Sequence, residues 1–152
     1  MDPQQIALTL GALLTVATLL GVLWQRRQGT VSRAGQRALP ADIPRELLTD
    51  GSAFTLLQFS GPFCSYCEAM RRVLTDAAAD YPGVVAHREI DITDYPELTQ
   101  RLAISQTPTT LVVSDTGHVI SRIRGAAKPP VIQAEIKNAI EHRKAASDEY
   151  LI

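Results

Sequence analysis

The stretch that decides the fold is "QFSGPFCSYCEAMRRVL", residues 58–74, which holds the only two cysteines of the chain, Cys64 and Cys67. An apolar run ends just before it, and an apolar repeat at helical spacing follows as far as Pro82-Gly83. The pattern predicts a strand, a loop and then a helix that begins at Cys64. Three interpretations are open for the thiols: a redox couple, half of a metal site, or two buried small residues.

The predicted position at the start of a helix favours the redox interpretation. Unpaired backbone N–H groups and the positive end of the helix dipole favour a thiolate at Cys64, and the thiolate is the form that attacks disulfides. Cys67, one turn further on, would lie close enough to attack a mixed disulfide formed there. A zinc site needs further ligands, and His87, His118 and His142 lie in separate predicted elements. The spacing therefore predicts a redox-active dithiol with no metal and no organic cofactor.

Length and charge set broad limits on the fold and the partners. The 152 residues fit one domain with a tail, and the net charge of −1 gives no basic footprint for nucleic acid. The sequence gives no indication of the oligomeric state.

The segments around the cysteines alternate between strand and helix patterns. Asp115-Thr116-Gly117 separates the last two strand patterns and is a hairpin signal. The order of the patterns predicts an α/β sheet covered by helices on both faces. The predicted strands are at 54–59, 84–92, 109–114 and 118–123, and the predicted helices are at 44–48, 64–81, 96–102 and from 130 onward.

The segment "IALTLGALLTVATLLGVLW", residues 6–24, carries no charge. As a helix it would cover roughly 28 Å, close to the hydrocarbon thickness of a bilayer, and Trp24 would lie at the interface. A buried core helix is the alternative, but the segment has no polar face. A cleaved signal peptide fits less well, because no basic region precedes the segment and no small-x-small site closes it. The segment is therefore predicted to span a membrane.

Charge on either side of this segment predicts the orientation. Only Asp2 and the amino terminus precede it, whereas Arg26, Arg27, Arg33 and Arg37 follow closely. Basic residues stay on the cytoplasmic side, so the N-terminus is expected outside and the rest of the chain inside. The reverse topology remains the alternative and would make the protein an extracytoplasmic reductant or oxidant.

Two motifs give the chain a resemblance to the thioredoxin family. "FSGPFCSYC" resembles the family's active-site stretch, and "ISQTPTTLVV", residues 104–113, resembles its cis-proline loop and following strand. The resemblance covers about residues 53–145 and implies a central mixed sheet with helices on both faces. The predicted division is an N-terminal tail at 1–5, a transmembrane helix at 6–24, a juxtamembrane linker and lead-in at 25–50, a thioredoxin-like domain at 51–146 and a C-terminal tail at 147–152.

The resemblance also implies roles for single residues. Cys64 is the expected nucleophile and Cys67 the resolving cysteine. Pro108 takes the place of the family's cis-proline, and Gly125 that of the glycine beside the substrate groove. The residues expected to contact substrate are Phe63, Ser65, Tyr66, Thr107, Pro108 and Gly125.

Several positions depart from the family pattern. Gln58 stands where thioredoxins bury an aspartate that helps deprotonate the second cysteine. Glu68 follows Cys67 directly, and its charge opposes a thiolate there. Ser65-Tyr66 lacks the proline of the reducing thioredoxins, and Arg72 replaces the proline that kinks the helix. Together these departures argue against a general-purpose thioredoxin.

The sequence thus predicts a membrane-tethered thiol–disulfide oxidoreductase. Its partners would be protein disulfide substrates and a protein electron donor. The alternative is a membrane-anchored adaptor whose thioredoxin-like domain binds a partner with little redox turnover.

Overall fold

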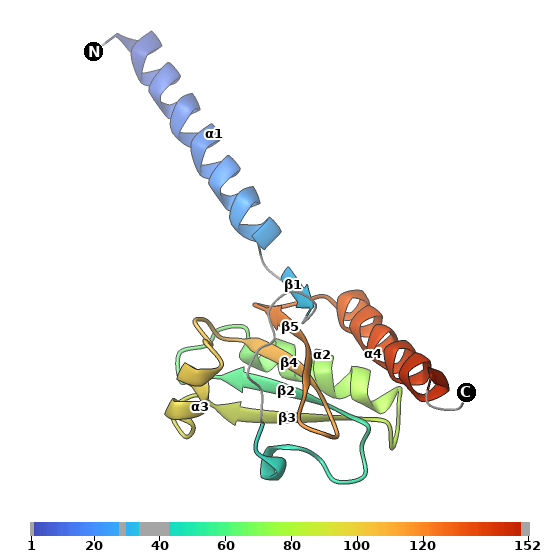
Figure 1. Cartoon of the computed structure of the whole chain (residues 1–152). Helices are drawn as coiled ribbons and strands as arrows, with labels where there is room; N and C mark the ends of the chain where they lie inside the picture. The colour runs from blue at the N-terminus through green and yellow to red at the C-terminus, as the bar shows by residue number, and fades with distance from the viewer. Residues whose placement is uncertain (1, 28–29, 34–42, 150–152) are drawn as a thin grey trace.

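The computed structural model describes the backbone of residues 2–27, 30–33 and 43–149. It describes the side chains of all these residues except 24–27, 33 and 146–149. Strands and helices alternate along the domain in the predicted order, and the α/β fold class is confirmed (Figure 1). The elements are α1 Pro3–Arg27, β1 Thr30–Arg33, the 3-10 helix η1 Arg45–Leu47, β2 Phe54–Ser60, α2 Cys67–Ala79, β3 Val85–Asp91, α3 Pro96–Arg101, β4 Thr109–Ser114, β5 Val119–Arg124 and α4 Pro129–Glu149.

Within the described residues, five strands form one mixed sheet in the order β1-β5-β4-β2-β3. β2 runs parallel to β3 and antiparallel to β4, while β5 runs antiparallel to both β4 and β1. Because β2 has neighbours on both sides and helices on both faces, every residue from 54 to 59 is buried. This explains why β2 reads as an almost continuous apolar run rather than an alternating one.

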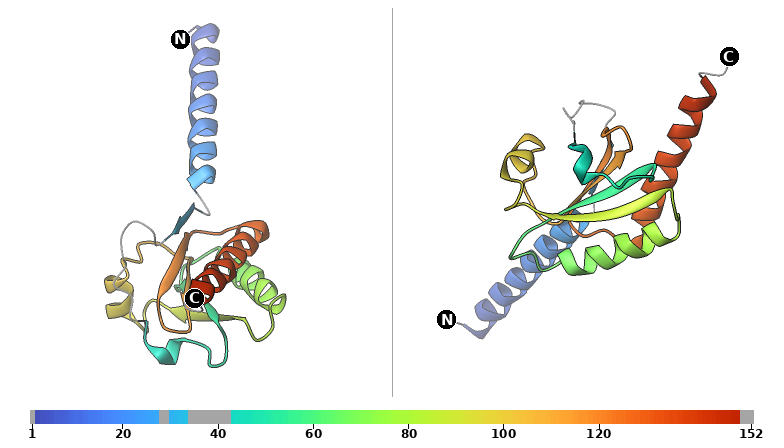
Figure 2. Two further views of the ribbon diagram at one scale, coloured as in Figure 1. Left: turned by 45° about the vertical axis from the view of Figure 1, so that its right-hand side comes forward. Right: turned by 90° about the horizontal axis from the view of Figure 1, so that it is seen from below.

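Helices cover the sheet on both faces (Figure 2). α2 and α4 lie on one face, where Leu56 packs with Met70 and Ile136. η1 and α3 lie on the other face, where Leu57 packs with Leu47 and Leu98. Neighbouring leucines on β2 therefore belong to two separate apolar cores, as the twofold period of a strand requires.

α1 has the length and composition of a membrane-spanning helix. Its stretch Pro3–Leu23 has a mean hydropathy of 2.3 and none of it is buried by the rest of the protein. The hydroxyls of Thr9, Thr15 and Thr18 donate to carbonyls one turn earlier, so the helix satisfies them internally. A signal sequence near an N-terminus has the same properties.

The predictions for the residues that follow the apolar stretch concern side chains outside what the structure describes. Trp24, whose side chain was predicted to lie at the membrane interface, is one of these residues. The side chains of Arg26, Arg27 and Arg33 and the whole of Arg37 are likewise outside the described residues.

β1 is an element that the sequence did not predict, because residues 25–50 read as a linker. Thr30–Arg33 pairs with β5 in register, with Thr30 opposite Arg124 and Arg33 opposite Ser121. Val31 also packs against the apolar core under α2 and α4. A four-residue strand gives little local signal, and it forms here because β5 offers a row of backbone groups for pairing. The linker prediction is wrong for these residues.

Candidate active site

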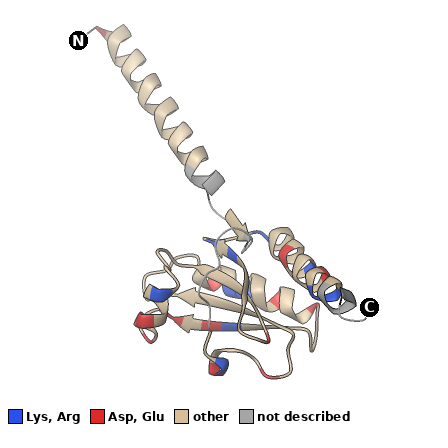
Figure 3. Cartoon of the chain, viewed as in Figure 1, with Lys and Arg blue, Asp and Glu red and all other residues tan. Residues whose placement is uncertain are grey.

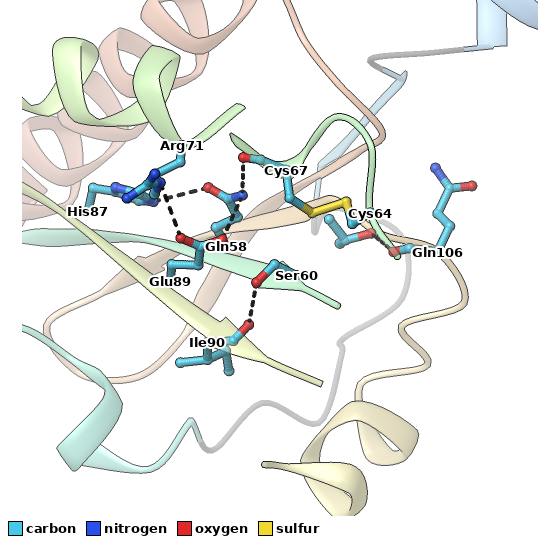
Figure 4. The surroundings of a disulfide bond; sticks show 10 residues. Gln58, Ser60, Cys64, Cys67, Arg71, His87, Glu89, Ile90 and Gln106 are labelled. Atoms are coloured by element: carbon cyan, nitrogen blue, oxygen red, sulfur yellow. Dashed lines mark hydrogen bonds and ion pairs between the residues drawn. A yellow bond between two sulfur atoms is a disulfide. The ribbon is translucent and has the colours of Figure 1, made fainter. Parts of the chain in front are cut away.

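Cys64, in the loop between β2 and α2, forms a disulfide with Cys67 (Figure 4). α2 begins at Cys67 and not, as predicted, at Cys64. The reason lies in the hydrogen bonds, since the Cys67 N–H reaches the Cys64 carbonyl in a turn, whereas the first helical bond runs from Met70 to Tyr66. Cys67 is buried, with 6% of its surface exposed, while Cys64 is half-buried at the surface.

The bonded sulfurs lie at the N-terminal end of α2, because Cys67 is the first residue of this helix. The unpaired N–H groups and positive dipole there stabilise a thiolate when the disulfide is reduced. The expected opposing charge of Glu68 is offset by Arg71 and Arg72, which both bond to its carboxylate. The hydrogen bond from Arg71 is the main reason that the pKa of Glu68 is lowered.

A cavity of about 270 Å³ opens beside Cys64. It lies between the disulfide loop, the loop before β4 and the residue after β5. The structure brings together every residue predicted for the substrate site and adds Gln106, which sequence reasoning missed although it is next to the predicted Thr107. The lining residues are Phe63, Cys64, Ser65, Tyr66, Gln106, Thr107, Pro108 and Gly125. We call this cavity the redox groove.

Backbone contacts hold the redox groove in shape. The Thr107–Pro108 peptide bond is cis, and the Gly125 N–H donates to the Pro108 carbonyl over 2.8 Å. Gly125 has a φ of 73°, a conformation that glycine adopts without steric cost. The Thr109 hydroxyl donates to the Gln106 carbonyl over 2.8 Å. These bonds join β5 and β4 to the loop that faces Cys64.

The pattern of a strand, a disulfide loop at a helix start and a cis-proline loop agrees with the comparison with known families. A family model described as Thioredoxin matches residues 44–138. The chain belongs to the thioredoxin family. A CxxC disulfide on this fold supports thiol–disulfide oxidoreductase chemistry in general terms.

Relatives of this thioredoxin-family chain include plant and fungal thioredoxins. Chloroplastic thioredoxin M3 of Oryza sativa subsp. japonica is 27% identical over 109 residues, which cover 72% of this chain and 62% of that protein. Chloroplastic thioredoxin Y2 of Arabidopsis thaliana is 25% identical over 63% of this chain and 57% of that protein. The chain thus spans less than two thirds of the length of these relatives.

Solved structures give the same fold. The oxidised mitochondrial thioredoxin 3 of Saccharomyces cerevisiae is 26% identical, with a TM-score of 0.52 over 62% of this chain and 85% of that chain. The thioredoxin NaTrxh of Nicotiana alata has a TM-score of 0.50 at 23% identity and covers 57% of this chain and 73% of that chain.

Gln58 links Cys67 to a polar network behind the disulfide (Figure 4). The side chain is fully buried on β2 and points toward Cys67, as predicted. Its Nε2 donates over 2.9 Å to the backbone carbonyl of Cys67, and its Oε1 lies 3.2 Å from Nε2 of His87. Glu89 Oε1 lies 3.5 Å from the same Nε2 of Gln58. The other carboxylate oxygen of Glu89, Oε2, lies 3.7 Å from Nε of Arg71.

His87 is a site residue that sequence reasoning missed, because the sequence showed three scattered histidines. The register of β2 with β3 places His87 opposite Leu56 and Glu89 opposite Gln58, so both side chains lie near the buried amide. An available signal was the spacing of His87 and Glu89, two residues apart and therefore on one face of a predicted strand.

Burial lowers the pKa of His87; the Glu89 charge opposes this shift and Arg71 adds to it. The imidazole is therefore neutral at pH 7. Gln58 Oε1 only accepts hydrogen bonds, so the proton must be on Nε2 of His87. Nδ1 then accepts from the Thr75 hydroxyl at 3.1 Å. In this arrangement, the Cys67 carbonyl contacts the Gln58 amide, and the His87 imidazole and the Glu89 carboxylate lie behind that amide.

Within the described residues, no three His, Cys, Asp or Glu side chains gather closely enough to hold a metal ion.

Proposed function

We propose that this protein is a membrane-tethered oxidoreductase that exchanges disulfides with protein substrates through Cys64 and Cys67. The observation that carries the proposal is the Cys64–Cys67 disulfide beside the redox groove, with Cys64 in its lining. No metal or organic cofactor is part of the proposed reaction, because the dithiol itself carries the two electrons.

In the reductive direction, the Cys64 thiolate attacks one sulfur of a substrate disulfide and forms a mixed disulfide. The substrate's other sulfur leaves as a thiolate and takes a proton. Cys67 then attacks Cys64, which forms the enzyme disulfide and releases the second substrate thiol. The substrate gains two electrons and the enzyme loses two, which a dithiol on a protein electron donor restores.

The redox groove supports an extended polypeptide as substrate. A chain that runs along Thr107 and Pro108 can pair with the backbone of this loop, as in β-augmentation. Phe63 is 98% exposed and Tyr66 is 51% exposed, so apolar side chains of the substrate can pack beside the disulfide.

The membrane tether is α1, whose stretch Pro3–Leu23 has the length and hydropathy of a span. Its arginine-rich C-terminal flank supports a cytoplasmic location for the redox domain. The reverse topology would place the disulfide in an oxidising compartment.

The first test is reduction of insulin by the full-length protein in detergent, with dithiothreitol as donor. We expect turnover with the native chain, none with Cys64→Ser, and a trapped mixed disulfide with Cys67→Ser.

The exposed Phe63 also fits a binding module that uses its thiols little. Absence of turnover while both cysteines are titrated as free thiols would reject the enzyme and leave this adaptor. The reduction potential of the dithiol then separates a reductant from an oxidant.

A further inference from the structure

The position of β1 limits how far the redox groove can lie from the membrane. We propose that the groove acts on disulfides in the juxtamembrane segments of other proteins in the same membrane, close to the bilayer surface. This inference rests on the proposed function, because it takes α1 as the anchor and Cys64 as the nucleophile.

The covalent and hydrogen-bonded path from α1 to the groove is short. α1 ends at Arg27, and only residues 28–29 separate it from β1. The first residue of β1, Thr30, pairs with Arg124, the last residue of β5. The next residue, Gly125, lines the redox groove. In Figure 1 the arrowhead of β5 lies beside β1, at the end of the sheet nearest α1.

Each step of this path has an upper length. From Leu23, where the apolar stretch ends, to Arg27 the helix advances about 6 Å. From Arg27 to Thr30 the chain covers at most about 11 Å even when fully extended. Crossing the antiparallel pair to Arg124 adds roughly 5 Å, and reaching Gly125 adds about 4 Å. Gly125 therefore lies no more than about 26 Å from the end of the apolar stretch, whatever angle the domain takes.

The bound is shorter than the diameter of the domain. Residues 43–149 correspond to a radius of gyration of about 13 Å, hence a diameter of about 34 Å for a compact domain. The edge of the redox groove at Gly125 therefore cannot lie on the surface of the domain farthest from the membrane, because that surface exceeds the bound. With a flexible tether instead of β1, no such limit would hold.

Charge around the groove fits this placement. Arg124 and Lys128 flank Gly125 along the chain, and Figure 3 shows basic residues at this end of β5 and in the segment before α4. Basic side chains near the surface are attracted to anionic lipid headgroups. A disulfide on a protein in the same membrane meets the groove at a high effective concentration if its tether matches the same height.

The test uses the full-length, reduced protein in phosphatidylcholine vesicles, with excess reductant removed. The probe is a synthetic single-span peptide whose flexible extramembrane segment carries one cysteine in a mixed disulfide with a coloured nitrobenzoate thiol. Reaction oxidises Cys64 and Cys67 to a disulfide and reduces the probe to two thiols, so colour reports the rate. With the cysteine about ten or about fifty residues from the span, we expect the near probe to react faster by on the order of tenfold.

Two insertions identify the path that sets this preference. A Gly/Ser spacer of about forty residues between Gln28 and Gly29 lengthens the route from α1 to β1, and should cut the ratio to roughly twofold. The same spacer directly after Arg33 leaves the route through β1 and β5 intact, and should keep the tenfold ratio. Insulin in solution should be reduced equally by all three proteins.

The outcomes separate this inference from the proposed function. No insulin reduction by the native chain would reject the oxidoreductase itself. Insulin reduction with equal rates for near and far probes would overturn only the membrane-proximal groove. Loss of the preference with the spacer after Arg33 would also overturn it, because β1 would then not fix the distance.

Discussion

Replacing Gln58 with glutamate tests whether Cys67 lacks a base. In the native chain, the Gln58 Nε2 donates to the Cys67 carbonyl over 2.9 Å and neither end of the amide can take a proton at neutral pH. A carboxylate at this position can accept the proton of Cys67 as it attacks the mixed disulfide. General-base help of this kind is typically worth roughly 10²–10⁴-fold. We therefore expect Gln58→Glu to speed the resolving step.

The neighbours of the new carboxyl determine how much of this gain appears at pH 7. Burial raises its pKa, and so does Glu89, which lies at 3.5 Å from the present amide nitrogen. His87, at 3.2 Å from the present amide oxygen, supports the carboxylate by donating from Nε2. If the pKa of the new carboxyl lies about one unit above the assay pH, about a tenth of the molecules carry the ionised carboxylate. The gain in the rate of the resolving step then falls to roughly 10–10³-fold. The acceleration should therefore increase with pH until the carboxyl is ionised.

The same substitution should destabilise the protein. A carboxylate oxygen would face the Cys67 carbonyl where a donor now lies, and leaving a buried acceptor unpaired costs about 1–3 kcal/mol. Urea denaturation of the reduced protein measures this cost.

Stopped-flow mixing of reduced protein with a coloured disulfide separates the two chemical steps. The formation of the mixed disulfide depends on substrate concentration, and its resolution by Cys67 does not. Gln58→Leu is the control, because it removes the amide without supplying a base. Equal resolution rates for the native and Gln58→Glu proteins across neutral pH would refute the reasoning. That result would indicate that Gln58 only packs. An equal gain in Gln58→Leu would also refute it, because the gain would then come from loss of the amide and not from a base.

Three further predictions concern other groups. The lowered pKa of His87 means that the unfolded chain binds a proton first as pH falls below about 6.5, so the free energy of unfolding should decrease there. His87→Gln should remove this decrease, whereas His118→Gln should keep it. Arg122 is buried and donates to the carbonyls of residues 102 and 103, so Arg122→Met should cost about 1–3 kcal/mol in urea denaturation, and more than Arg124→Met. In intact cells, a membrane-impermeant thiol reagent should not label reduced Cys64; labelling before lysis would place the domain outside.

The sequence predicted the parts of the fold that leave a local signal. β2 is an almost continuous apolar run, the β4–β5 hairpin has Asp115-Thr116-Gly117, and α3 begins with proline. The redox groove followed from the resemblance, since its residues come from three segments that no local pattern connects. β1 and His87 were missed because both depend on strand register. Thr30–Arg33 becomes a strand only through β5, and His87 approaches Gln58 only because β3 runs parallel to β2.

The buried network and the short tether together bear on which substrates the proposed enzyme would use. Gln58 offers Cys67 an amide in place of a carboxylate, so we expect the mixed disulfide on Cys64 to be long-lived. A long-lived mixed disulfide is unfavourable for an enzyme that must turn over many soluble substrates. It costs less when the protein serves few partners, because each dithiol then has to turn over less often. The expected slow resolving step and the proposed position of the groove near the membrane therefore both favour a small set of membrane-bound partners over general disulfide reduction.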